Sequence, residues 1–146
     1  LRSYQNDTWA ERGSDTHYHQ FPAVFRTGHK ESFRFKETAV SKDGSAWTQD
    51  WEGTLEVKGK ERVRVPAGEF DAWRIERVAT YQGTRSKGKG QPTWYGRNTV
   101  TTWYAPEVHN FVARDEETRQ NGSNLADRSR VELTSFERRT ATVAKN

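Results

Sequence analysis

The sequence predicts an all-β protein, built as a single strongly curved antiparallel sheet that forms a half-open or closed barrel with little helix. Apolar and polar residues alternate with a period of two through most of the chain, as in half-buried strands. Turn-forming residues separate these stretches, and no stretch keeps a helical period. Flat sheets of this size are unusual and strand edges need cover, so we expect strong curvature. We assign residues 1–20 to an irregular lead-in, 21–137 to the β domain and 138–146 to a flexible tail.

The composition agrees with one small domain whose core depends on large rings. The chain has 146 residues, of which 32% are hydrophobic and 12% aromatic, including six tryptophans. Cysteine is absent, which excludes disulfides, zinc–thiolate sites and cysteine nucleophiles. No window is apolar enough to span a bilayer, so no transmembrane segment is expected in this chain. Because it starts at Leu1, without a methionine, we expect a processed or trimmed chain, with any targeting segment outside the sequence in view.

The first strands follow a polar start. Residues 1–20 are read as a lead-in with one short helical turn or an edge strand, and the chain is expected to be strand-like after Pro22. Phe33 and Phe35 alternate with polar neighbours, which predicts a strand over 31–40. The Asp-Gly pair that follows is a strong hairpin signal, because both turn positions favour positive φ.

The clearest strand is predicted over 46–58, where one face is apolar and the other polar. Its apolar face carries Trp47, Trp51, Leu55 and Val57. Gly53 is expected to mark a bulge or bend in this strand. A turn at Gly59 and Lys60 should lead into a further strand over 61–65.

The remaining strands are predicted over 70–81, 98–104, 110–118 and 128–137, about seven in all. A mobile basic loop is predicted over 82–93, and a turn over 121–124. Pro66 ends a strand because it has no N–H to donate to a ladder. Gly68 is expected to take a positive φ that other residues avoid.

Two turns carry a resemblance to known proteins. They read Val-Pro-Ala-Gly-Glu-Phe-Asp at 65–71 and Trp-Tyr-Ala-Pro-Glu-Val at 103–108. Over residues 21–136 the chain resembles an uncharacterised family of bacterial envelope β domains that carry these turns. The resemblance implies a curved sheet of the lipoprotein-carrier type and a periplasmic or envelope location, and it brings no established catalytic residues. His109 stands where this family usually has glycine, so a positive φ there would strain the histidine.

The candidate binding site lies around the basic loop. Trp94 and Tyr95 are adjacent, so on a strand they point to opposite faces, and one ring is exposed unless the loop covers it. Exposed rings beside cations stack on sugars or bases. The candidate ligand-binding residues of this region are Trp94, Tyr95, Arg97, Arg85, Lys87 and Lys89. Nucleic acid is not expected as the partner, because the net charge of +4 is modest and no nucleic-acid motif is present.

An alternative ligand site is the concavity of the curved sheet. The residues expected to line it are Trp47, Trp51, Trp73, Ile75 and Tyr81. Small barrels either hold one apolar ligand or are filled by side chains, and we expect the filled case here.

Catalytic and metal chemistry have weaker support. His17 and His19 share one face of an extended segment with Asp15 nearby, but no third metal ligand can be placed, so we predict no metal and no cofactor. Asp115 and Glu117 share a strand face and would be the acidic pair of a hydrolase, but a solvated face explains them better, because a chain with twenty acidic residues offers such pairs by chance.

These observations favour a non-enzymatic envelope domain that acts as a structural or binding module. A carbohydrate, peptidoglycan or apolar-ligand binding domain is the alternative, and a hydrolase is the competing class. The expected partner is an envelope polymer, an apolar small molecule or a protein.

Overall fold

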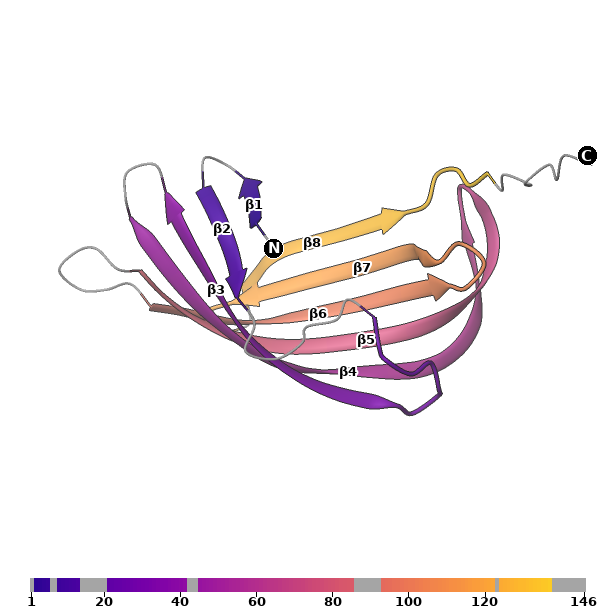
Figure 1. Ribbon diagram of the computed structural model, residues 1–146, viewed down its shortest axis with the longest axis horizontal. Helices are drawn as coiled ribbons and strands as arrows, with labels where there is room; N and C mark the ends of the chain where they lie inside the picture. Colours follow the sequence, from indigo (N-terminus) through magenta and orange to yellow (C-terminus); the bar gives the residue numbers. More distant parts are fainter. Residues whose placement is uncertain are drawn as a thin grey trace, which may run out of the picture.

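A computed structural model of the chain describes residues 2–5, 8–13, 21–41, 45–85, 93–122 and 124–137. These residues form one antiparallel sheet whose strands follow the order of the sequence (Figure 1). The strands are β1 (Arg2–Gln5), β2 (Thr8–Gly13), β3 (Lys30–Ser41), β4 (Ala46–Val65), β5 (Gly68–Arg85), β6 (Thr93–Ala105), β7 (Asn110–Gln120) and β8 (Asn124–Glu132). No helix occurs among the residues so described, which confirms the all-β prediction.

The sheet is open. Strand β1 lies at one edge and β8 at the other, and within the described ranges these two strands do not pair. A closed barrel is therefore not the arrangement that these residues adopt. The sheet is nevertheless strongly bent, and Figure 1 shows the joined ends of β4 and β5 turning back beside the chain that follows β8.

Several strands differ from the predicted bounds. Strands β1 and β2 occupy part of the expected irregular lead-in. Strand β5 continues to Arg85 and β6 begins at Thr93, so both ends of the predicted basic loop belong to the ladder. Strand β8 ends at Glu132, five residues before the predicted end at 137. Residues 86–92, like the expected tail 138–146, lie outside the described residues.

The turn expected at Gly59 is instead a bulge inside one long strand. Pairing with β5 continues on both sides of it, and the register shifts by one residue between Val57 and Gly59. Gly59 has a φ of 147°, which a side chain rarely permits, so the glycine accommodates the extra residue without leaving the ladder. The bulge predicted at Gly53 is absent, because Gly53 pairs regularly with Ala79.

The register defines two faces of the sheet. The aromatic face carries Trp51 and Tyr81, which are directly opposite each other on β4 and β5. The groove face carries Thr80 of β5 and Arg97 of β6, also directly opposite each other, and Tyr95 two residues along β6. Along each strand, successive side chains point alternately to the aromatic face and to the groove face.

The aromatic face contains the first core. Its buried side chains are Phe35, Leu55, Val57, Ile75, Ala79, Tyr81 and Val100. A row of rings crosses three strands: Phe35 stacks on Trp51 with centroids 5.6 Å apart, and Trp51 contacts Tyr81 at 4.6 Å. Burial raises the pKa of the Tyr81 hydroxyl. The expected core of a few large rings is thus present.

Residues 21–29 cover one end of the aromatic face and do not form the strand expected after Pro22. The Gly28 N–H donates to the carbonyl of Val57 at 2.8 Å. The ring of Phe25 stacks on Tyr104 at 4.7 Å and lies 6.1 Å from the ring of Trp73. This segment therefore closes the Trp73 end of the aromatic face.

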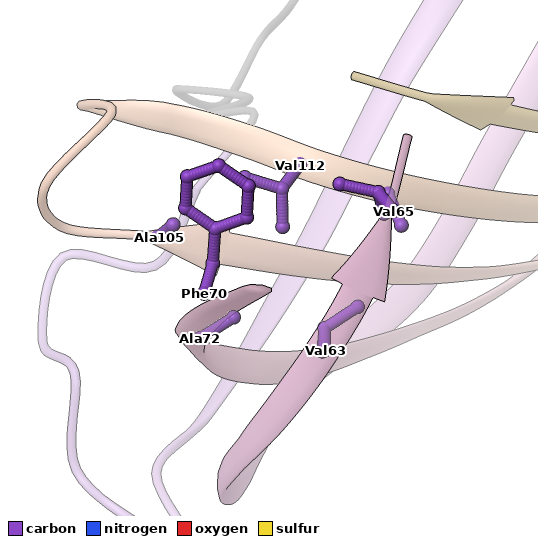
Figure 2. Close-up of a cluster of buried hydrophobic side chains, with 7 residues drawn as sticks. Val63, Val65, Phe70, Ala72, Ala105 and Val112 are labelled. Atoms are coloured by element: carbon purple, nitrogen blue, oxygen red, sulfur yellow. The ribbon is translucent and has the colours of Figure 1, made fainter. Parts of the chain in front are cut away.

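A second core lies on the groove face, where the tip of the β4–β5 hairpin folds over β6 and β7 (Figure 2). It consists of Val63, Val65, Phe70, Ala72, Ala105, Val112 and Ala113. The chain after β8 ties the tip down, because the Ala67 N–H donates to the Leu133 carbonyl at 3.0 Å and the Leu133 N–H donates to Val112 at 2.8 Å. Phe136 adds an edge contact to Phe70 at 6.3 Å.

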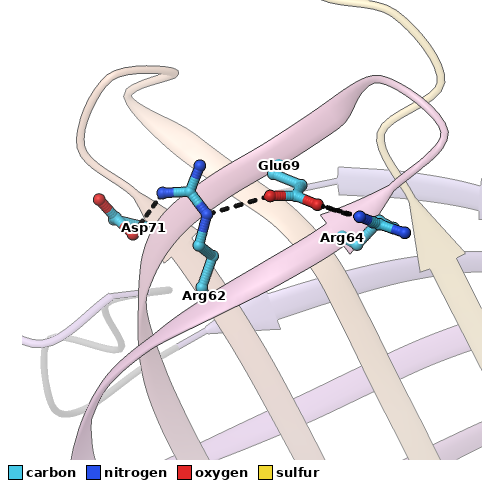
Figure 3. A network of polar contacts seen from close by, with 4 residues as sticks. All are labelled: Arg62, Arg64, Glu69 and Asp71. Atoms are coloured by element: carbon cyan, nitrogen blue, oxygen red, sulfur yellow. Dashed lines mark hydrogen bonds and ion pairs between the residues drawn. The ribbon is translucent and has the colours of Figure 1, made fainter.

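The opposite side of this hairpin tip is ionic (Figure 3). Arg62 donates to Glu69 at 3.1 Å and to Asp71 at 3.2 Å, and Arg64 also pairs with Glu69. Hydrogen bonds from Arg64 and then Arg62 lower the pKa of the Glu69 carboxyl. The hairpin tip is therefore amphipathic, with its apolar side toward the second core and its charges in water.

Two backbone expectations are confirmed at the turns. Gly68 has a φ of 132°, and His109, at the position where the resembled family has glycine, has a φ of 58°. Both values lie where side chains with a Cβ are strained.

We predict that Gly68→Val destabilises the domain by roughly 1–3 kcal/mol. A Cβ at Gly68 would meet only the Phe70 ring, at 3.9 Å, so the loss should come from backbone strain and not from a clash. Chemical denaturation would measure it, with Thr54→Val at an exposed strand position as the control. Equal stability of the two variants would contradict the assignment.

Candidate functional site

Trp94 and Tyr95 point to opposite faces of the sheet, as expected for neighbours on a strand. Trp94 is opposite Gly83 on the aromatic face, and Tyr95 is opposite Gln82 on the groove face. The Tyr95 side chain is 57% exposed, whereas Trp94 is half-buried. Tyr95 is thus the ring of this pair that is available to a ligand.

Trp94 is engaged by its own domain. Its Nε1–H donates to Gln49 Oε1 at 3.2 Å, and its edge contacts the Trp47 ring at 6.3 Å. The Trp94 ring also lies flat over Gly83, where a Cβ would come within 2.1 Å of ring carbon Cε2. Trp94 is therefore a packing residue of the aromatic face.

The same arrangement of a ring over a glycine recurs twice on the aromatic face. Phe33 lies over Gly53, and Tyr81 lies over Gly96. In each case ring and glycine are on neighbouring strands, so the missing side chain provides the space in which the ring lies against the backbone. The need for space beneath the Phe33 ring therefore explains the glycine at position 53 better than the predicted bulge does.

The predicted apolar site is divided by the fold. Trp47, Trp51 and Trp73 all lie on the aromatic face, but Trp73 is at the end covered by Phe25, with the Lys60 ammonium 4.8 Å from its ring. Trp51 donates its indole N–H to Glu37 at 3.2 Å. The structure brings Trp47 together with Trp94 and keeps Trp73 apart.

The predicted basic cluster is divided as well. Arg85 is opposite Trp47 and so belongs to the aromatic face, away from Tyr95 and Arg97. Lys87 and Lys89 lie outside the described residues. Only Tyr95 and Arg97 of the predicted ligand-binding residues share the groove face.

Two overlapping hollows, of about 550 and about 580 Å³, lie over strands β3 to β6 on the groove face. We call them together the β3–β6 groove. Two rows of directly opposed residues cross it. One is Lys36, Asp50, Gln82 and Tyr95, and the other is Arg34, Glu52 and Thr80, which continues past the lining of the hollows to Arg97 of β6. The volume suits a ligand of one or two sugar rings in size.

Charges on β3 and β4 are neutralised within the groove. The Arg34 guanidinium lies 3.1 Å from Glu52, and the Lys36 ammonium lies 3.5 Å from Asp50. All four side chains are more than half exposed, so these pairs add little to stability but offer donors and acceptors to a ligand. Thr80 and Gln82 form the exposed middle of the groove, and Tyr95 lines its β6 side.

Arg97 lies at the end of its row on β6. Its side chain is exposed, and its position is directly opposite a second arginine, Arg119 of β7. Arg119 pairs with Glu117 at 2.7 Å, whereas no ion pair holds Arg97 within the described residues. Beside the β6 side of the groove, the sheet therefore carries the exposed Tyr95 ring and Arg97, for which the described part of the chain provides no acidic partner.

The sequence did not single out the groove, because its residues were read as the solvated side of separate strands. They converge only through the register of four neighbouring strands. The one signal in the sequence was the regular polar alternation opposite Trp47 and Trp51.

The acidic cluster on β7 is bound by arginines. Asp115 accepts hydrogen bonds from Arg130 at 2.8 and 2.9 Å. Glu117 pairs with Arg119, and Glu116, on the opposite face, accepts from Asn98 at 2.8 Å. This pairing favours a structural role for Asp115 and Glu117 over that of a hydrolase pair.

His17, His19 and Asp15 lie outside the described residues. Within the described ranges no group of three or more potential metal-ligating side chains comes together. No helix in the same ranges is long and apolar enough to cross a membrane.

Comparison with known proteins found no matching family model, curated protein or solved structure.

We predict that Gly83→Ala destabilises the domain by about 1–3 kcal/mol, because the new methyl group displaces the Trp94 ring. In a Trp94→Ala background the same change should cost much less, which denaturation of the four variants of this cycle would measure. The control is the same cycle with Gly96→Ala and Tyr81→Ala. A methyl group at position 96 would also lie 2.4 Å from the Arg119 carbonyl oxygen, so removing the Tyr81 ring should not restore the stability lost in Gly96→Ala. Additive losses at Gly83 and Trp94 would contradict this account.

Proposed function

We propose that this domain is a non-enzymatic binding module of the bacterial cell envelope that holds a saccharide in the β3–β6 groove. The observation that carries the proposal is the exposed Tyr95 ring beside the exposed side chains of Thr80 and Gln82. An aromatic ring with neighbouring hydroxyl and amide groups is the combination that a sugar requires.

The chemistry of a sugar matches these groups. The C–H face of a sugar ring packs on an aromatic ring, and its hydroxyls both donate and accept hydrogen bonds. Thr80 and Gln82 can do both, Glu52 and Asp50 can accept, and Arg34 can donate. An extended polymer could continue along the groove, because the two hollows share Arg34, Glu52 and Thr80.

The envelope assignment rests on the resemblance of the two turns at 65–71 and 103–108 to a family of envelope domains. The same resemblance implies that the open, bent sheet is a half-barrel of the lipoprotein-carrier type. Together these points favour an envelope polysaccharide as the partner over an apolar small molecule or a protein.

We expect Tyr95→Ala to weaken saccharide binding roughly tenfold, about 1.4 kcal/mol, because the stacking surface is lost. Tyr95→Phe should bind as the wild type does, because it keeps the ring. Co-sedimentation with purified peptidoglycan sacculi and with lipopolysaccharide would measure this. Leu125→Ala, which removes another exposed apolar side chain (55% exposed) on β8, is the control. Failure of the wild-type protein to bind either polymer would refute the proposal.

A further inference from the structure

The groove face carries an electrostatic conflict beside Tyr95. Arg97 of β6 and Arg119 of β7 occupy directly opposed positions, so both guanidinium groups project from the same face. Like charges at directly opposed positions destabilise a sheet. Glu117 relieves this for Arg119, to which it is paired at 2.7 Å. Arg97 has no such ion pair within the described residues, so its charge lies beside that of Arg119.

The surrounding positions show that the repulsion is local. At the other end of the same row Arg34 is opposite Glu52, and in the next row Lys36 is opposite Asp50. Further along β7, Asp115 is opposite Arg130 and pairs with it. Opposite charges thus face each other at these positions, whereas Arg97 has Thr80 on one side and Arg119 on the other.

The unbalanced charge lies next to the exposed ring. Tyr95 and Arg97 are two residues apart on one strand, so their side chains leave the same face about two strand residues, roughly 7 Å, apart. That separation lets a sugar ring stack on Tyr95 while one of its substituents reaches Arg97. The β3 and β4 side of the groove is neutral by comparison, because its two cations are paired with two anions.

We infer that the saccharide held in the groove carries an acidic group, a carboxylate or a phosphate, which binds at Arg97 and Arg119. This inference rests on the proposed function and names the ligand class of the same groove. A guanidinium binds an oxyanion through paired N–H donors, and an oxyanion between two arginines removes their mutual repulsion. Arg97 therefore gives specificity for an acidic over a neutral sugar, and Tyr95 gives binding to both.

The test compares three disaccharides by calorimetry at low salt. The neutral reference is di-N-acetylchitobiose, the carboxylate probe is N-acetylglucosaminyl-N-acetylmuramic acid, and the phosphate probe is a glucosamine disaccharide bisphosphate. The wild-type protein should bind one acidic probe at least about tenfold more tightly than the neutral one, and the preference should shrink as salt is raised. The probe preferred identifies a peptidoglycan-type or a lipid-headgroup-type source.

Arg97→Gln should abolish the preference by weakening the binding of the acidic probes, and Arg97→Lys should keep part of the preference. The melting temperature of unliganded Arg97→Gln should equal or exceed that of the wild type, because the repulsion with Arg119 is relieved. Arg26→Gln, which removes the same charge from an exposed position in segment 21–29, should keep the full preference.

The outcomes separate the two proposals. Equal affinity of the wild type for acidic and neutral probes, or a preference that survives in Arg97→Gln, would overturn the acidic-ligand inference. The proposed saccharide-binding function would still hold if chitobiose binding depended on the Tyr95 ring. Absence of binding to all three disaccharides and to both envelope polymers would overturn both.

Discussion

The one-residue bulge between Val57 and Gly59 determines which faces of this sheet can be buried. Before the bulge Val57 is opposite Ile75, and both belong to the aromatic face. After it Val63 is opposite Phe70, and both belong to the groove face. Because side chains alternate along a strand, a single inserted residue moves each later β4 side chain to the opposite face of the sheet. A regular strand would place Val63 and Val65 on the aromatic face and would leave no second core.

The two cores explain why the groove lies where it does. The aromatic face is packed with rings and is covered at one end by residues 21–29. Among the described residues, the groove face is covered where the hairpin tip folds over β6 and β7, and its side chains Thr80, Gln82 and Tyr95 are exposed. Large side chains are concentrated on the aromatic face, including the rings that lie over Gly53, Gly83 and Gly96. The middle of the groove face carries the exposed polar side chains of Thr80 and Gln82.

Local patterns in the sequence predicted most of the strands from β3 onward, the opposite orientation of Trp94 and Tyr95, and the positive φ of Gly68. Each of these depends on residues that are close in the chain. The turn expected at Gly59 was wrong because a glycine that breaks a strand and one that accommodates a bulge have the same sequence signal. The convergence of Arg34, Gln82 and Tyr95 on one groove could not be predicted, since it depends on the register of strands far apart in the sequence. For the same reason, no local pattern could show that Arg97 faces Arg119.

The position of that arginine pair makes the two sides of the groove differ in charge. A sheet that needed only stability would favour an acidic residue at one of the two positions, as at Asp115 opposite Arg130. The opposed cations lie instead at the β6–β7 side of the groove. Arg97 is two residues from Tyr95, which is the one exposed tyrosine among the described residues that line the two hollows. A neutral β3–β4 side and a cationic β6–β7 side would hold a polar, elongated ligand in one orientation, with its acidic end at Arg97. In the acidic-ligand proposal, an anion bound there relieves the repulsion between Arg97 and Arg119, so the preference for acidic ligands comes from this pair while Tyr95 supplies the stacking surface.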